Sequence, residues 1–129
     1  MHDSGQAFQL INQTTNEIII EHLEVAESFW QRFKGLMGRR ELARDHGLYL
    51  RPCNSIHCFF MRFPIDVVFL DKSDTVVAVY PAVRPWRIIL PGSGAYSAIE
   101  GMAGHLAKQV RIGDSLTIKE ANNEKISPQ

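Results

Sequence analysis

Apolar residues occur along the chain in short runs rich in Val, Ile, Leu and Phe, and turn-forming residues separate these runs. This pattern is typical of β-strands. Residues 57–71 form the most apolar run, and Pro64 divides it because proline lacks the N–H that a central strand needs. We therefore predict an approach segment over 57–63 and a strand after the proline. The predicted strands are 8–12, 17–25, 47–50, 65–71, 75–80, 95–100 and 115–119.

One stretch has the pattern of a helix. Ser28 and Gln31 have the spacing of a capping box, and the apolar residues that follow recur at helical spacing. We predict a helix over 27–38 that ends at Gly38, and a second, short helix over 102–109. The broad apolar face of the first helix consists of Phe29, Trp30, Phe33, Leu36 and Met37.

The order of these elements predicts one α+β domain over residues 1–129. Its centre is a bent, mostly antiparallel β-sheet or partly open β-barrel of six to eight strands, with one or two helices packed on it. We expect the helix that begins at Ser28 to lie across one opening. The core spans about 7–120, and the polar residues 121–129 are predicted to form a frayed tail. Segment 81–94 is predicted to be an irregular loop in which 88–90 pairs briefly.

Composition and charge narrow the possible partners. Fourteen Lys and Arg residues balance fourteen Asp and Glu residues, so the chain has no net charge. It therefore lacks the positive charge that would indicate nucleic-acid binding. No apolar run has the length of a membrane span, and the first residues lack the pattern of a signal peptide. We therefore expect a cytoplasmic location, or an exported one if a leader has been removed. An unknown small molecule or a protein is the expected partner.

Asp66 lies within the most apolar run, where its carboxylate is predicted to be shielded from water. An isolated buried carboxylate shifts its pKa upward or finds a partner. One interpretation is structural: Asp66 pairs with Arg62, Arg32 or Arg39, or accepts backbone N–H groups near Pro64. The other is that Asp66 acts as a general base or orients a substrate.

Further candidates surround this run. His57 and Glu100 could act with Asp66 in acid–base catalysis. Arg32, Arg39 and Arg62 could bind a carboxylate or phosphate, although pairing with acidic residues is the alternative. Trp86 lies in the proline-rich loop, where an aromatic ring could cover a ligand or meet a partner.

Metal and cofactor signatures are weak or missing. Cys53, His57 and Cys58 are potential ligands, but they lack the paired spacing of a zinc site. No phosphate-binding loop, dinucleotide fingerprint, zinc-protease motif or hydrolase nucleophile motif is present. We therefore predict no metal and no cofactor.

Several short motifs together resemble one family. They are Gly35–Arg39 preceded by Arg32, Gly47–Leu50, Ser55–Met61, Pro64–Asp71, Glu100 and Ile112–Asp114. In this order the motifs resemble a bacterial and archaeal family called domain of unknown function 192, over residues 20–119. The resemblance implies a compact, mostly β domain, and it implies no activity because the family is uncharacterised. Many members carry polar residues where this chain has Arg62 and Phe63, so roles of those polar residues do not carry over.

These observations leave two classes of function open. The first is a ligand-binding or protein-interaction module, with its site between residues 57–66, 81–94 and Glu100. The second is a small hydrolase or other acid–base enzyme that uses Asp66 with His57 or Glu100. No motif in the sequence decides whether the protein is an enzyme.

Overall fold

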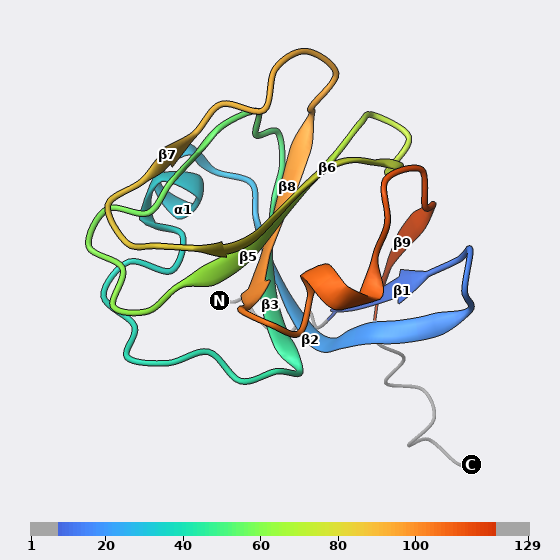
Figure 1. Cartoon of the computed structure of the whole chain (residues 1–129), viewed down its shortest axis with the longest axis horizontal. Coiled ribbons are helices and arrows are strands. Elements are labelled where there is room, and N and C mark those ends of the chain that lie inside the picture. The colour runs from blue at the N-terminus through green and yellow to red at the C-terminus, as the bar shows by residue number, and fades with distance from the viewer. Residues whose placement is uncertain (1–7, 121–129) are drawn as a thin grey trace.

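The computed structural model describes residues 8–120, so the tail predicted over 121–129 lies outside the described residues. Within this range the chain forms strands, one short α-helix and one 3₁₀ turn (Figure 1). The elements are β1 (Phe8–Asn12), β2 (Glu17–Ala26), α1 (Phe29–Lys34), β3 (His46–Leu50), β4 (Ile56–His57), β5 (Ile65–Leu70), β6 (Val76–Val83), β7 (Ile88–Ile89), β8 (Ser97–Met102), η2 (Ala107–Gln109) and β9 (Leu116–Glu120).

Seven of these strands form one curled sheet in the order β6-β5-β8-β3-β2-β1-β9. Its neighbouring strands are antiparallel except for β2 and β3, which run parallel. The sheet curls into a half-barrel, and β4 and β7 form a separate two-stranded sheet beside α1 (Figure 1). The predicted bent sheet with little helix is therefore confirmed.

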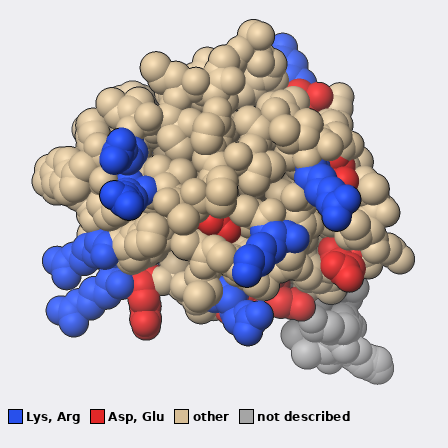
Figure 2. Space-filling view, viewed as in Figure 1, with Lys and Arg blue, Asp and Glu red and all other residues tan. Residues whose placement is uncertain are grey.

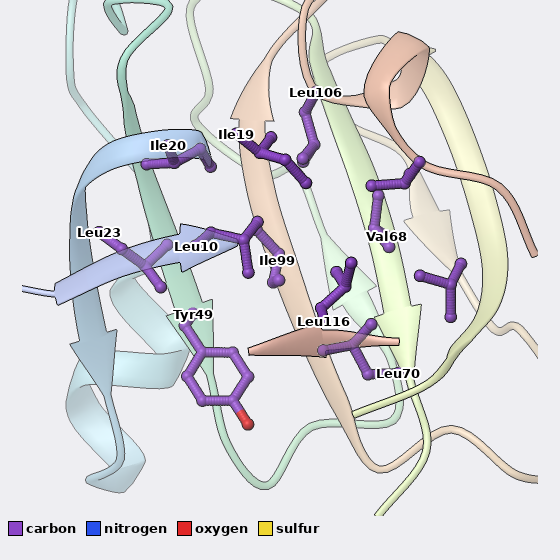
Figure 3. Packing of buried hydrophobic residues seen from close by; sticks show 12 residues of the cluster. Leu10, Ile19, Ile20, Leu23, Tyr49, Val68, Leu70, Ile99, Leu106 and Leu116 are labelled. Atoms are coloured by element: carbon purple, nitrogen blue, oxygen red, sulfur yellow. The ribbon is translucent and has the colours of Figure 1, made fainter. Parts of the chain in front are cut away.

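The inner face of the curl holds one hydrophobic core. Alternate residues of the strands point to this face, because side chains along a strand alternate between the two sides of a sheet. Figure 3 shows these side chains converging from β1, β2, β3, β5, β8 and β9. Leu106, from the segment before η2, also packs against this core.

The outer face of the sheet carries a second core. Val67 and Phe69 of β5 point outward, opposite to Val68 and Leu70. Residues from β4 and β7 cover them, together with Leu36 and Met61. Because β5 is covered on both faces, all six of its residues are buried, which explains its uninterrupted apolar sequence.

Two helical predictions were too long. The first helix spans only Phe29–Lys34, and the second is reduced to the 3₁₀ turn Ala107–Gln109. The predicted capping box is present, because Ser28 accepts from the Gln31 N–H and the Gln31 side chain accepts from the Ser28 N–H. The chain leaves the helix at Gly35, whose φ of 47° is in the region that favours glycine. No side chain of α1 is buried; the buried Leu36 follows the helix.

Strand β6 is longer than predicted. It continues through Pro81 to Val83, into the segment predicted to be an irregular loop. Pro81 is tolerated because β6 lies at the edge of the sheet and has only one neighbouring strand. The brief pairing predicted for 88–90 is present as β7, which pairs with β4.

Candidate functional site

Asp66 is fully buried on the inner side of β5, and backbone donors occupy its carboxylate. One oxygen accepts from the Ala82 N–H at 2.8 Å. The other accepts from the N–H groups of Gly104 at 3.1 Å and Ala107 at 2.8 Å. None of the arginines proposed as its partners makes an ion pair with it within residues 8–120. The geometry therefore matches the structural interpretation, in which the carboxylate accepts backbone N–H groups.

These hydrogen bonds hold a bend in the edge strand. The pairing of β5 with β6 shifts register between Ile65 and Val67, opposite Ala82. Ala82 has a φ of 51°, a left-handed conformation that is unfavourable for alanine. The charge-assisted hydrogen bond from its N–H to Asp66 stabilises that conformation. Asp66 thus fixes the point where the chain leaves β6 for the loop that carries Trp86.

His57 uses both ring nitrogens for backbone contacts. The Phe59 N–H donates to Nδ1 at 3.2 Å, so Nδ1 is the unprotonated nitrogen. The protonated Nε2 then donates to the carbonyl oxygen of Phe33 at 2.9 Å. His57 therefore ties the last turn of α1 to β4, and both of its ring nitrogens have backbone partners.

His57 also lies in the middle of a row of aromatic rings. Its ring centroid is 5.2 Å from that of Phe33 and 5.0 Å from that of Phe59. Trp86 lies 5.7 Å from Phe59 and 4.7 Å from Phe60. On α1, Phe29 and Trp30 continue the row beyond Phe33. We call this set the aromatic ridge: Phe29, Trp30, Phe33, His57, Phe59, Phe60 and Trp86.

The aromatic ridge is largely open to solvent. Trp30 is 72% exposed, Phe29 64%, and Trp86 and Phe60 both 59%. Ile88 and Leu90, two and four residues after Trp86, are also exposed. Clustered exposed aromatic side chains are unusual on a monomeric protein and mark interaction surfaces.

The backbone that presents two of these rings is constrained. Phe60 has a φ of 62° and Trp86 a φ of 69°, both unfavourable for bulky side chains. Hydrogen bonds hold both positions. The Trp86 N–H donates to the Cys58 carbonyl at 2.7 Å, and the Gly38 N–H donates to the Phe60 carbonyl at 3.1 Å. The fold thus fixes two large aromatic residues in strained conformations at the surface, a property that clusters at functional sites.

The segments that build the aromatic ridge carry cations but no carboxylates. Residues 29–34, 57–63 and 84–90 contain five Lys or Arg residues and no Asp or Glu. None of the five is in an ion pair with a carboxylate of residues 8–120. Figure 2 shows basic side chains on the side where Figure 1 places α1 and β7, beside a broad uncharged surface. The five are Arg32, Lys34, Arg62, Arg84 and Arg87.

The predicted ligand-binding residues therefore separate into two groups. Arg32, Arg62 and Trp86 belong to the segments of the aromatic ridge. Arg32 also donates to the Glu27 carbonyl. Arg39 belongs to none of these segments and makes a bidentate ion pair with Glu24, with distances of 2.9 and 3.1 Å.

Glu100 lies on the outer face of the sheet. It pairs in register with Val67, while Asp66 pairs with Gly101, so the two carboxylates point to opposite faces. Glu100 is 3% exposed, and its Oε1 has no hydrogen-bond partner among residues 8–120. Burial raises its pKa to about 8, although the positive charge of Arg39 opposes the shift. The structure therefore does not bring Asp66 and Glu100 together.

The two cysteines remain thiols in the structure. Burial raises the pKa of Cys58 to about 11, and the nearby Glu100 carboxylate adds to the shift. Burial also raises the pKa of Cys53, whose thiol donates to the Ser55 carbonyl at 2.9 Å. In residues 8–120 no three His, Cys, Asp or Glu side chains are grouped to hold a metal ion.

Sequence reasoning missed most of the aromatic ridge. The apolar spacing of Phe29, Trp30 and Phe33 predicts a face packed on the domain, whereas all three side chains are exposed. The sequence holds no signal that separates the two cases, because Gln31, Arg32 and Lys34 form a polar face opposite the aromatic one, as in a helix packed on a core. The sequence shows Phe59 and Phe60 only as part of the apolar run 57–71.

Comparison with known proteins places the chain in a family. The DUF192 family, described as "Uncharacterized ACR", matches residues 10–118. The chain belongs to the DUF192 family. A UPF0127 protein of Thermococcus sibiricus is 37% identical over 83% of this chain and 72% of its own length. A UPF0127 protein of Pyrococcus abyssi is 36% identical over 83% of this chain and 94% of its own.

A solved structure supports the fold of this DUF192 domain. A protein of unknown function from Novosphingobium aromaticivorans matches with a TM-score of 0.75, covering 91% of this chain and 90% of its own. The two sequences are 17% identical, so this likeness concerns the fold alone. The two UPF0127 relatives are archaeal, so the bacterial source that the resemblance also allowed gains no support from them. The family is uncharacterised, and its members supply no activity for this chain.

Residues 8–120 of this DUF192 domain contain no helix that is both long and apolar enough to cross a membrane.

Proposed function

We propose that this DUF192 domain is a protein-interaction module whose contact surface is the aromatic ridge. The observation that carries the proposal is the continuous row of rings from α1 to Trp86, in which Phe29, Trp30, Phe33, Phe60 and Trp86 are exposed. Large aromatic side chains that remain in water leave apolar surface exposed, and a partner that covers them recovers about 25 cal/mol for each Å² buried. Trp and Arg are also the residues most enriched among those that dominate protein–protein binding energy.

The charges around the aromatic ridge indicate the chemistry of the partner. Arg62, Arg84 and Arg87 belong to segments without a carboxylate. A partner that supplies carboxylates around an apolar anchor would match both features, because complementary charges increase association rate and specificity. We therefore expect a protein segment that combines apolar and acidic residues.

The fold supports this use because hydrogen bonds of His57 and Asp66 fix the backbone segments that carry the aromatic ridge. His57 connects the end of α1 to β4 through its two ring nitrogens. Asp66 fixes Ala82, where the chain enters the loop of Trp86. Asp66 and His57 thus hold the binding surface in shape, which lowers the entropy lost on binding.

A photo-crosslinking residue at position 86 tests the proposal in cells of the source organism. The matched control carries it at Ile112, an exposed apolar position at 69% exposure in the turn before β9. We expect a discrete protein to crosslink to position 86 and not to position 112. With that protein purified, Trp86→Ala should weaken binding by about 2 kcal/mol or more, and added salt should weaken it further. Identical crosslinks at both positions, or an affinity unchanged by Trp86→Ala, would contradict the proposal.

A further inference from the structure

A pocket of about 380 Å³ lies between the end of β6, the loop that follows it and β7. Figure 1 shows the chain leaving β6, turning back and returning as β7 beside α1. The wall combines apolar residues with two arginines, Arg84 and Arg87, and no carboxylate of residues 8–120 lines it. Trp86 lies between these arginines in the chain, so the pocket adjoins the segment that contributes Trp86 to the aromatic ridge.

Both arginines carry a charge that no carboxylate of the described chain neutralises. Arg84 and Arg87 are exposed, and neither is in an ion pair with a carboxylate of residues 8–120. Two guanidinium groups on the wall of one pocket repel each other, and an anion bound there lowers this repulsion while it accepts their paired N–H groups. The pocket therefore favours an anionic ligand.

The backbone of the wall offers few further donors to an anion. Pro81 has no N–H, and the Ala82 N–H already donates to Asp66 at 2.8 Å. Among residues 8–120, no glycine lines the pocket and no helix begins at it. Phosphate sites commonly use the backbone N–H groups of a glycine-rich loop or a helix N-terminus, whereas guanidinium groups alone match a carboxylate. The anion that fits best is therefore a carboxylate.

The same backbone decides how a peptide could bind. β6 is an edge strand, and the edge of a sheet can accept a further strand. Here Pro81 interrupts the row of donors, and Ala82, with a φ of 51°, bends the strand. A partner is therefore recognised through a side chain rather than through strand addition. Ile88 lines the pocket and is 58% exposed, so it can cover the methylene groups of that side chain.

We propose that this pocket binds an acidic side chain of a partner protein, with the carboxylate held by Arg84 and Arg87. The inference rests on the proposed function, because it names the pocket that receives the acidic part of the partner while the aromatic ridge contacts the apolar part. A free small anion would use the same guanidinium groups, but it would leave Ile88 and the adjacent Trp86 uncovered.

The test is NMR titration of the full chain with blocked tripeptides at millimolar concentration. The probe is Ac-Leu-Glu-Leu-NH₂, whose only charge is the glutamate carboxylate, and Ac-Leu-Gln-Leu-NH₂ is its matched control. We expect the glutamate peptide to shift the amide resonances of Val83, Ile88 and Ile89 and the Nε–H resonances of Arg84 and Arg87. The glutamine peptide should bind at least about tenfold more weakly, because it lacks the charge-assisted hydrogen bonds.

Two small anions and three variants complete the test. Propionate has the carboxylate without the peptide, and inorganic phosphate tests the arginines as a phosphate site; both should bind more weakly than the glutamate peptide. Arg84→Gln and Arg87→Gln should each weaken binding of the glutamate peptide by at least about fivefold and leave binding of the glutamine peptide unchanged. Arg111→Gln, at an exposed arginine that does not line the pocket, is the matched control and should change neither.

Equal binding of the two peptides would overturn the inference, as would shifts confined to residues outside the pocket. Propionate or phosphate binding as tight as that of the glutamate peptide would also overturn it, because the pocket would then be a site for a free anion. These outcomes are distinct from those of crosslinking at position 86. A discrete crosslinked protein together with no peptide binding would leave the proposed function in place and remove only the pocket.

Discussion

Asp66 and Glu100 lie on neighbouring strands, one position apart in register, yet their surroundings are opposite. Asp66 faces the inside of the curl and accepts three backbone hydrogen bonds. Glu100 faces the outer side, where its Oε1 has no partner in the described chain. The inner face therefore satisfies its buried carboxylate, whereas the outer face does not. A buried acid alone does not indicate function; a buried acid left unsatisfied does.

The same difference extends to the apolar residues. On the inner face, the side chains of β1, β2, β5 and β9 pack against one another and exclude water (Figure 3). On the outer side, the helix that lies over the sheet buries none of its own residues and exposes three aromatic rings. Both faces of the sheet thus carry a buried core, and the outer side presents in addition exposed aromatic rings and a buried carboxyl oxygen without a partner among residues 8–120.

The largest expected effect on stability comes from substitution of Asp66, whose carboxylate has its hydrogen-bond partners. Asp66→Ala removes three charge-assisted hydrogen bonds and leaves buried N–H groups without acceptors, which should lower the free energy of unfolding by about 5 kcal/mol or more. Because that approaches the whole stability of a typical domain, we expect the variant to be largely unfolded by circular dichroism.

Asp71→Ala is the matched control for Asp66. Asp71 also accepts two backbone hydrogen bonds, from Ser73 and Thr75, but in the turn between β5 and β6. Its loss should lower stability by about 1 kcal/mol in urea denaturation. Equal losses of unfolding free energy in the two variants would show that burial does not make the hydrogen bonds of Asp66 more important to stability than those of the exposed turn.

Glu100, the carboxyl group without a full set of partners, should show the opposite behaviour: removing its charge should stabilise the fold at high pH. The pKa of Glu100 is raised to about 8 in the folded state, so between its ordinary value of 4.5 and about 8 the folded chain keeps a proton that the unfolded chain loses. Stability therefore falls as pH rises through this window, by up to about 5 kcal/mol. Glu100→Gln removes this dependence and should be more stable than the parent at pH 9 and similar at pH 4.

Urea denaturation at a series of pH values measures this difference. The stability of the Glu100→Gln variant should decline less than that of the parent between about pH 5 and 8, and the two curves should converge in acid. Parallel curves for parent and variant would mean that the carboxyl group is not held in its protonated form.

The contrast between the two faces also separates what the sequence predicts from what it cannot. The strands, the start of β5 after Pro64 and the burial of Asp66 follow from local sequence patterns. The partners of Asp66 do not, because its donors Ala82 and Ala107 lie 16 and 41 residues away. The lack of a hydrogen-bond partner for Oε1 of Glu100 likewise depends on which groups the fold brings near it, and those groups are distant in the sequence.

Helix α1 shows a different limit of sequence reasoning. Its aromatics recur at helical spacing, and that pattern is the same whether the apolar face meets a core or a partner protein. The predicted boundaries were too long for a related reason. Leu36 and Met37 continue the apolar spacing, although the backbone has already left the helix at Gly35.

His57 tests the link between the sheet and the aromatic ridge. His57→Ala removes two backbone hydrogen bonds and a ring packed between Phe33 and Phe59, so stability should fall by about 2 kcal/mol. The diagnostic readout is hydrogen exchange, which should accelerate in residues 29–34 and leave β5 protected until global unfolding. His46→Ala, at a partly exposed histidine paired with Asp45, is the control and should leave α1 unchanged.

The smallest expected effect is at the most exposed ring of α1. Trp30→Ser should change the free energy of unfolding by no more than about 0.5 kcal/mol, because the ring is 72% exposed and lies outside both cores. Leu36→Ala, six residues along the chain and 1% exposed, should lower it by about 3 kcal/mol. If Trp30 contributes this little to folding, stability does not explain the exposed ring, and binding to a partner does. If urea denaturation shows Trp30→Ser to be as destabilising as Leu36→Ala, the aromatic ridge belongs to the core, and the difference between the two sides of the sheet disappears.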